Sequence, residues 1–177
     1  GGDGTHSAAI NALMRIEKEQ PDKPLPPYAF IPMGTGNDMA KYFGLANRED
    51  FFVSDLRRAV STIFYGADYR MDLGIYKGRY FGDAVAVGVD SRILQQRNRR
   101  RAAINRIPAL RRLVRGRLLY SLVLGPCILA ANPVHTEVFV DGGLWYSGPI
   151  INLIIKNTRV YAADFEFCAA TYANDGL

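Results

Sequence analysis

Residues 1–7 have the sequence Gly-Gly-Asp-Gly-Thr-His-Ser, and residues 32–38 have the sequence Pro-Met-Gly-Thr-Gly-Asn-Asp. These two glycine-rich turns decide the fold, because each leads directly into a segment with helical character. Glycine lets the backbone pass close to phosphate oxygens with its N–H groups turned inward, and the following helix adds its positive end. Neither turn contains the Gly-Lys-Ser/Thr of a Walker loop, and the second lacks the third glycine of a dinucleotide-binding turn. The pair therefore predicts a phosphate site of another kind.

The segments that follow the turns predict an α/β layer. Residues 8–18 have apolar side chains at helical spacing, and the loop 20–27 contains four prolines. Residues 28–31 form a short apolar run of the size of a buried parallel strand, and residues 39–43 begin another helix. A glycine turn, helix, strand, glycine turn and helix in succession indicate a parallel sheet covered by helices.

The pattern changes near residue 69, where short stretches of alternating polarity begin. They cover residues 69–76, 79–89, 136–140 and 150–156, and turns rich in glycine separate them. This pattern predicts an antiparallel β region, interrupted by an Arg-rich helical stretch over residues 92–131.

Three kinds of side chain in the turns are suited to phosphate chemistry. Asp3 is able to accept a proton from an attacking hydroxyl, or to hold a magnesium ion by way of water. Thr5 and Thr35 each offer a hydroxyl to a phosphate. His6 is placed to touch a phosphate, although a helix-start position without chemistry is the favoured interpretation. The residues of the two turns predicted to surround the phosphate groups of a ligand are Gly1, Gly2, Asp3, Gly4, Thr5, His6, Ser7, Gly34, Thr35, Gly36, Asn37 and Asp38.

Ten arginines lie between residues 92 and 117, and no acidic residue occurs between Asp90 and Glu137. A solvated helix face usually mixes the two signs of charge, so this stretch indicates an anionic partner. Anionic lipid headgroups and nucleic acid both fit. The near absence of aromatic residues disfavours stacking on single-stranded nucleic acid, so a membrane surface is expected and nucleic acid is not. The arginines predicted to face that surface are Arg99, Arg100, Arg101, Arg111 and Arg112.

The chain has 177 residues, 49% of them hydrophobic, which is enough for one ordinary domain or two small packed halves. Its two cysteines build no disulfide framework and are expected to be free thiols in a reducing compartment. The apolar run 118–131 is shorter than the roughly 20 residues of a membrane span, so a core helix is expected there. Both ends are abrupt, so we expect an internal fragment of a longer protein. No secretory signal is visible, and the expected location is cytoplasmic with peripheral membrane association.

At these residues the chain resembles the diacylglycerol kinase catalytic domain family, which includes sphingosine, ceramide and bacterial lipid kinases. The family pattern Gly-Gly-Asp-Gly-Thr, with an Asn in the next helix, is matched by residues 1–5 and Asn11. The second turn is matched by residues 32–38, a later Gly-Val-Asp step by residues 88–90, and a closing Asp-Gly-Leu by residues 175–177. The resemblance covers essentially the whole chain in the right order.

This resemblance implies an ATP site between a Rossmann-like part, residues 1–67, and an antiparallel β-sandwich-like part for the lipid substrate, residues 68–177. Asp175 would belong to a magnesium site, helped by main-chain oxygens near Tyr172 and Leu177. In bacterial relatives the acid assigned as catalytic lies beyond this Asp-Gly-Leu, whereas in sphingosine kinases the loop aspartate, Asp3 here, resembles the base.

The chain departs from the family pattern at a few positions near the predicted lipid part. Asp83 stands where an Asn is usual, Ala162-Ala163 where a glycine pair is usual, and Ala169 near the place of a usual proline. The function expected first is transfer of the γ-phosphate of ATP to the hydroxyl of diacylglycerol or a sphingoid-type lipid. A kinase for a soluble substrate, similar to NAD kinases, and an inactive nucleotide- and lipid-binding module are the alternatives. The oligomeric state stays open.

Overall fold

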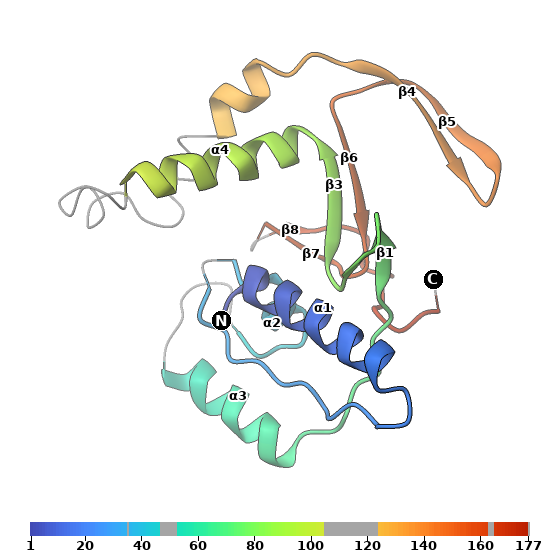
Figure 1. Cartoon of the computed structure of the whole chain (residues 1–177). Coiled ribbons are helices and arrows are strands. Elements are labelled where there is room, and N and C mark those ends of the chain that lie inside the picture. The colour runs from blue at the N-terminus through green and yellow to red at the C-terminus, as the bar shows by residue number, and fades with distance from the viewer. Residues whose placement is uncertain (35, 47–52, 105–123, 163–164, 177) are drawn as a thin grey trace. The chain divides into compact units, whose positions relative to one another are not determined.

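The computed structural model describes residues 1–34, 36–46, 53–104, 124–162 and 165–176 (Figure 1). They form two compact units: unit 1 comprises residues 1–85 and 156–177, and unit 2 comprises residues 86–155. The division at residues 67 and 68 into an ATP-binding and a lipid-binding part concerns ligands, so it stays a prediction. The expected combination of an α/β region with antiparallel strands is confirmed.

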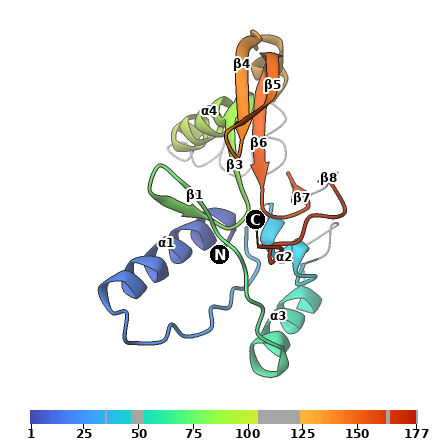
Figure 2. The same ribbon diagram turned by 90° about the vertical axis from the view of Figure 1, so that its right-hand side faces the viewer.

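The described residues of unit 1 include three helices: α1 (Asp3–Glu19), α2 (Asp38–Tyr42) and α3 (Val53–Tyr65) (Figures 1 and 2). The two helices predicted after the glycine turns are confirmed. The first begins five residues earlier than residue 8, because the second half of the glycine turn already forms its first turns. The sequence analysis did not predict α3.

The apolar run 28–31 is not a strand, which corrects the expectation of a parallel strand there. A strand needs a neighbouring backbone with which to exchange hydrogen bonds. Here the described backbone bonds next to the run go to a single residue: the Gly1 amino group donates to the Ile31 carbonyl at 2.9 Å, and the Met33 N–H donates to the Gly1 carbonyl at 3.0 Å. These two bonds hold the second glycine turn beside the first.

Two short antiparallel pairs belong to unit 1. β1 (Gly74–Tyr76) pairs with β2 (Arg79–Phe81), and β7 (Val160–Tyr161) pairs with β8 (Phe165–Glu166). The predicted antiparallel character is thereby confirmed for residues 74–81, although the paired strands are shorter than the alternating stretches.

Asn11 attaches β2 to α1. Its amide nitrogen donates to the carbonyls of Ser7 and Tyr80, both at 2.8 Å, and its amide oxygen accepts the Tyr80 N–H at 3.0 Å. The Asn of the resemblance pattern thus has a structural role: it supplies backbone partners to a strand that follows it by 69 residues.

We expect Asn11→Ala to lower the free energy of unfolding by about 1–3 kcal/mol, because it leaves the Tyr80 N–H and carbonyl without their partners. Urea denaturation of the two proteins measures this difference. Asn98→Ala, at an exposed position of α4 (Val89–Ile104), is the control and should change stability by less than about 0.5 kcal/mol. Equal stability of the Asn11→Ala variant and the parent would show that these bonds are not maintained in solution.

Unit 2 is built on β3 (Ala84–Gly88), β6 (Asn152–Lys156) and the hairpin of β4 (Val134–Val140) and β5 (Gly143–Ile150), and the ends of β3 and β6 continue into unit 1. α4 (Val89–Ile104) follows β3 directly, and residues 124–129 form a further helical segment. A small core of Val89, Ile93 and Cys127 joins these two helices. Of the predicted helical stretch 92–131, residues 92–104 and 124–129 are helical, whereas residues 130 and 131 are not.

The backbone geometry explains the residues found at Gly88-Val89-Asp90. Gly88 has φ 113, and a Cβ there would collide with the Ile151 carbonyl, so only glycine permits the close approach of β3 to β6. Asp90 and Asn152 then bond reciprocally: the Asp90 N–H donates to the Asn152 amide oxygen at 3.2 Å, and the Asn152 amide donates to the Asp90 carboxylate at 2.9 Å. The step fixes where β3 ends and α4 begins.

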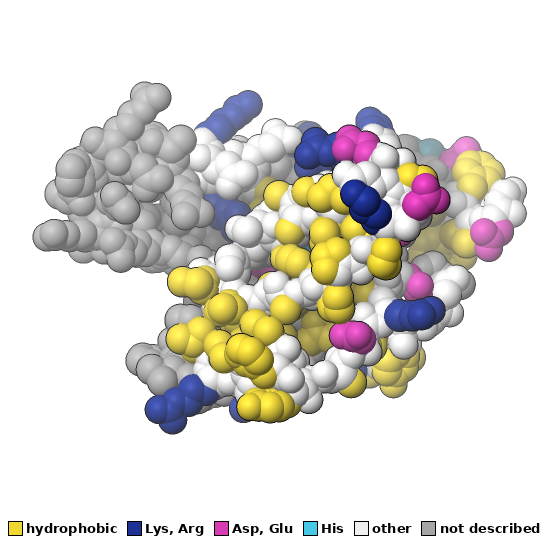
Figure 3. Space-filling model, turned by 60° about the horizontal axis from the view of Figure 1, so that its bottom comes forward, with side chains coloured by type: hydrophobic (Ala, Val, Ile, Leu, Met, Phe, Trp, Pro, Cys, Tyr) yellow, Lys and Arg dark blue, Asp and Glu magenta, His cyan; other side chains and the backbone are white. Residues whose placement is uncertain are grey.

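Hydrophobic side chains gather on one face of the molecule, with charged ones among them (Figure 3), and α3 contributes several exposed apolar residues. Ala59 and Asp55 are fully buried on one side of this helix. On its other side Phe64 is 73% exposed and Tyr65 87% exposed. Among the described residues, α3 therefore has one packed side and one apolar side open to solvent.

Candidate phosphate-binding site

The two glycine turns meet backbone to backbone. A Cβ added to Gly2 would lie 2.7 Å from the Gly34 Cα, and a Cβ added to Gly34 would collide with the Gly2 Cα. Any side chain at either position would push the turns apart. The structure therefore brings together the two motifs that the sequence analysis assigned to one phosphate site.

Asn37 shapes the second turn. It adopts the left-handed conformation with φ 56, which asparagine tolerates better than most residues, and it is buried. Its amide oxygen accepts the Gly34 N–H at 2.7 Å, and its amide nitrogen donates to the Gly34 carbonyl at 2.9 Å. The Asn37 side chain therefore bonds within the second turn, where it was predicted to help bind the nucleotide.

Asp3 faces the second turn from the start of α1. Its carboxylate accepts a long hydrogen bond of 3.4 Å from the Met39 N–H of α2. A Cβ added to Gly36 would lie 3.0 Å from the Asp3 carboxylate and 3.3 Å from the Asp38 carboxylate. Two carboxylates thus border Gly36, an arrangement suited to the magnesium ion that accompanies a nucleotide.

The start of α1 presents backbone donors on an open side. The N–H groups of Thr5 and His6 donate to the Gly2 carbonyl at 2.9 and 3.0 Å, whereas those of Asp3 and Gly4 precede the first carbonyls of the helix. A Cβ added to Gly4 would meet nothing within 4 Å. The free space beside these donors is what a phosphate group needs, so the residues present fit the predicted ligand.

The other predicted members of the first turn differ in their surroundings. The Thr5 side chain lies under Gly1, whose added Cβ would be 2.8 Å from the Thr5 hydroxyl. Ser7 is half-buried, and its carbonyl accepts the Asn11 amide. Thr35 lies outside the described residues.

His6 is buried against aromatic rings. Its ring centroid lies 4.8 Å from that of Phe30 and 5.3 Å from that of Tyr28. Burial lowers the pKa of His6, and the carboxylates of Asp3 and Asp83 oppose this by raising it. Its contact with a phosphate stays a prediction.

The chain end that carries Asp175 is attached to a residue that the sequence analysis missed. The Asp72 N–H donates to the Ala173 carbonyl at 2.7 Å, and the Asp72 carboxylate accepts the Gly176 N–H at 2.8 Å. The Ala173 N–H in turn donates to the hydroxyl of Tyr42, the last residue of α2, at 2.8 Å. The short helix α2 therefore extends from the phosphate turn at its start to residue 173 at its end. The available signal for Asp72 was its position as the one charged residue of the stretch 71–76.

The carboxylates near this chain end affect the pKa of Tyr69. Its hydroxyl lies 3.3 Å from that of Tyr42. Burial, the Tyr42 hydrogen bond and the carboxylates of Asp72 and Asp175 together raise the pKa of Tyr69 to about 12. Two carboxylates thus act on one hydroxyl group here.

The magnesium assignment stays a prediction. Asp175 and Tyr172 are both exposed, and Leu177 lies outside the described residues. Within the described part of the chain, no group of three or more His, Cys, Asp and Glu side chains is placed to hold a metal ion. A single carboxylate with main-chain oxygens and water is nevertheless a usual kind of magnesium site.

Asp83, which stands where the family usually has Asn, forms an ion pair with Lys156. The Lys156 ammonium donates to the Asp83 carboxylate at 2.8 Å and to the Val160 carbonyl at 2.6 Å. The same Asp83 oxygen accepts the hydroxyl of the fully buried Thr158 at 2.5 Å. The departure from the family pattern therefore produces a satisfied internal ion pair.

Ala162, where the family usually has glycine, has φ 49 and begins the turn between β7 and β8. A non-glycine residue in this conformation destabilises the folded protein by about 1–2 kcal/mol. Glycine avoids this strain, but it loses more conformational entropy on folding, which offsets part of the gain. We expect Ala162→Gly to raise the free energy of unfolding by about 0.5–1 kcal/mol, measured by urea denaturation. Ala8→Gly, in the helical interior of α1, should lower it by a similar amount. A destabilised Ala162→Gly variant would contradict the strain.

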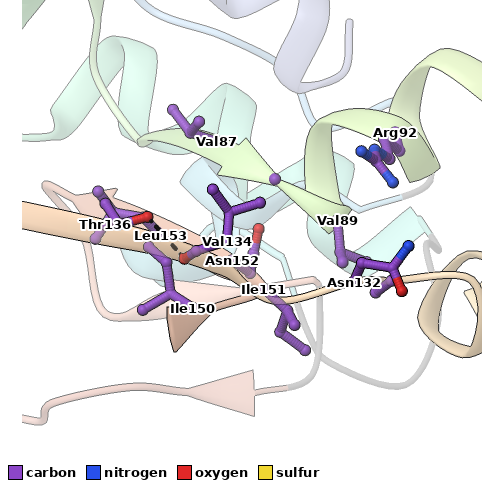
Figure 4. A pocket seen from close by; sticks show the side chains of 12 residues that line it. Val87, Val89, Arg92, Asn132, Val134, Thr136, Ile150, Ile151, Asn152 and Leu153 are labelled. Carbon is purple, nitrogen blue, oxygen red and sulfur yellow. Dashed lines mark hydrogen bonds between the residues drawn. The ribbon is translucent and has the colours of Figure 1, made fainter. Parts of the chain in front are cut away.

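A separate pocket of about 250 Å³ lies within unit 2 (Figure 4). Its wall is largely apolar, with side chains from β3, β6 and the start of β4, and Arg92 approaches it from α4 (Figure 4). Polar groups of Asn132 and Asn152 also border it. The chemistry of this wall fits an apolar chain that carries a polar or anionic group.

The predicted membrane-facing arginines are described in part. Arg99 and Arg100 are exposed on α4, whereas Arg111, Arg112 and the side chain of Arg101 lie outside the described residues. No helix in the described part of the chain combines the length and the apolarity needed to cross a membrane.

Comparison with known proteins finds a family model that matches the part of the chain containing both glycine turns. Residues 1–74 match the diacylglycerol kinase catalytic domain. The predicted resemblance is thereby confirmed. Diacylglycerol kinases of Bacillus subtilis strain 168 and Mycobacterium tuberculosis H37Rv are 24% and 26% identical to this chain over 177 and 182 aligned residues. Both alignments cover the whole chain and 51% of the relative, so the chain spans about half the length of these curated relatives.

The fold has a counterpart among solved structures. A crystal structure of a diacylglycerol kinase from Bacillus anthracis str. Sterne superimposes with a TM-score of 0.63 at 18% identity. The superposition covers 99% of this chain and 49% of that one. The chain therefore shares the fold of that protein over the part present here.

Proposed function

We propose that this chain carries the nucleotide-binding part of a lipid kinase that transfers the γ-phosphate of ATP to a lipid hydroxyl. The observation that carries the proposal is the backbone contact of the two glycine turns at Gly2 and Gly34, with Asp3 beside it. The relatives described as diacylglycerol kinases support the kinase assignment and a diacylglycerol-like lipid.

In this proposal the backbone donors at the start of α1 bind the phosphates, and Asp3 accepts the proton of the attacking hydroxyl. The lipid oxygen forms the new bond to the γ-phosphorus while the bond to the bridging oxygen of the departing ADP breaks. A magnesium ion would offset the charge on the phosphate oxygens, with Asp175 and main-chain oxygens near Tyr172 and Leu177 as its protein donors. The apolar pocket of unit 2 is suited to part of the lipid.

The test is a transfer assay with the full-length protein, magnesium and labelled ATP. Diacylglycerol and sphingosine in mixed micelles are offered beside NAD and fructose 6-phosphate. The expected result is label in diacylglycerol or sphingosine alone. Label in NAD or the sugar phosphate would establish the soluble-substrate kinase instead. ATP binding without transfer to any of the four would establish an inactive binding module.

We further propose that the arginines of α4 hold the protein against an anionic membrane surface, where a lipid substrate is found. Each basic residue near such a surface contributes about 1 kcal/mol. Arg99→Gln with Arg100→Gln should therefore weaken sedimentation with phosphatidylserine-containing vesicles by about 10- to 30-fold, and high salt should release the parent protein.

Arg15→Gln is the control for this variant, because Arg15 is also exposed but lies on α1, with Glu19 as its neighbour at 4.0 Å. It should bind vesicles like the parent. If the double variant sediments normally but loses affinity for RNA or DNA, the arginines form a nucleic-acid surface and the membrane proposal is wrong.

A further inference from the structure

The imidazole of His6 has one ring nitrogen without a hydrogen-bond partner among the described residues. His6 is 7% exposed, and its Nδ1 lies 3.3 Å from the Tyr28 hydroxyl. Its Nε2 is buried and makes no hydrogen bond within the described part of the chain. A buried polar atom without a partner is costly, so native proteins satisfy nearly all of them. The unpaired Nε2 therefore points to a ligand atom.

The tautomer of His6 depends on its bond to the Tyr28 hydroxyl. Burial raises the pKa of Tyr28, so this hydroxyl keeps its proton, and it is able either to donate to Nδ1 or to accept from it. Burial also lowers the pKa of His6, although the charged groups that act on it, Asp3 and Asp83, oppose this. A neutral imidazole whose Nδ1 accepts a hydrogen bond carries its proton on Nε2. The unpaired atom is then an N–H donor.

The place of His6 in α1 brings this donor to the glycine turns. The backbone N–H of His6 donates to the Gly2 carbonyl at 3.0 Å, at the point where Gly2 contacts Gly34. Helical side chains lean toward the start of their helix, which is the end of α1 where this contact lies. We propose that Tyr28 fixes His6 in the tautomer protonated on Nε2, and that this N–H donates to a phosphate oxygen of the bound nucleotide. This role rests on the proposed nucleotide site and makes Tyr28 a positioning residue.

The first test needs no substitution. In full-length protein labelled with ¹⁵N-histidine, the His6 resonances should show the Nε2–H tautomer, and addition of ADP should shift the Nε2 signal. Tyr28→Phe should produce a mixture of tautomers, which loss of packing alone would not cause. A His6 protonated on Nδ1, or an Nε2 signal that saturating ADP leaves unchanged, would overturn the proposal.

Two substitutions measure the hydrogen bond. His6→Phe keeps an aromatic ring without a donor and should raise the Kd for ADP about 10- to 100-fold, the range for a hydrogen bond to a charged group. His6→Gln keeps an N–H near the position of Nε2 and should recover most of the affinity. Equal ADP affinity in the parent and the His6→Phe variant would refute the phosphate contact while leaving the nucleotide site intact. A parent protein that binds no ADP would instead refute the proposed function itself.

Discussion

Asp3→Asn in the full-length protein is expected to lower kcat for lipid phosphorylation by about 10²- to 10⁴-fold, the usual contribution of a general base. Asparagine keeps the size of the side chain and an oxygen that accepts the Met39 N–H, which lies 3.4 Å from the Asp3 carboxylate. It neither accepts the proton of the hydroxyl nor brings a full negative charge beside Asp38. The affinity for ATP should change much less than kcat. Steady-state kinetics with a nucleotide-binding titration measures the two effects separately.

Asp22→Asn is the matched control, because this exposed aspartate lies in the loop after α1 and away from both glycine turns. It should leave kcat unchanged. Near-normal turnover of the Asp3→Asn variant would show that another group accepts the proton. Loss of ATP affinity in parallel with kcat would instead assign Asp3 to the binding of the nucleotide and its magnesium ion.

The part of the structure that the sequence predicted best depends on backbone conformation. Gly2 and Gly34 are required because no Cβ fits between the two turns, and this constraint is visible in the sequence as two glycine motifs. The helices after them follow from local periodicity and from glycine-bounded starts. Gly88 belongs to the same class, since its positive φ and its contact with the Ile151 carbonyl exclude other residues.

The parts that the sequence did not predict depend on contacts between distant segments. Asp72 holds the chain end by its bonds to Ala173 and Gly176, which follow it by about a hundred residues. The ion pair of Asp83 and Lys156 likewise joins positions 73 residues apart. No local pattern encodes such pairings.

Two further differences have physical causes of the same kind. The apolar run 28–31 has the composition of a strand, but a strand also needs a partner backbone, which composition does not supply. The position of His6 was expected to be a helix start, and its burial against Phe30 follows from the packing of that run on α1. Local sequence therefore predicted the turns and helices, whereas the side chains that connect them required the structure.

Gly4→Ala is expected to weaken ATP binding by about 100-fold or more without harming the fold. A methyl group at this position meets no protein atom within 4 Å, so the folded protein accommodates it. Alanine also favours the helix over glycine by up to about 1 kcal/mol, so the melting temperature should stay equal or rise. In the proposed complex the methyl group occupies the space where a phosphate approaches the backbone donors of Asp3 and Gly4. Loss of two charge-assisted hydrogen bonds, each worth about 1.5–3 kcal/mol, accounts for the expected change in Kd.

The choice of glycine makes this experiment specific for the ligand. Gly2→Ala would collide with Gly34 in the protein itself, so loss of ATP binding in that variant would not separate a blocked site from a disturbed fold. Gly125→Ala is the matched control, because Gly125 also lies in a helical segment and an added Cβ there meets nothing within 4 Å. It should bind ATP like the parent. If Gly4→Ala and Gly125→Ala bind ATP equally well, the phosphates do not lie at the start of α1, and the proposed site is wrong.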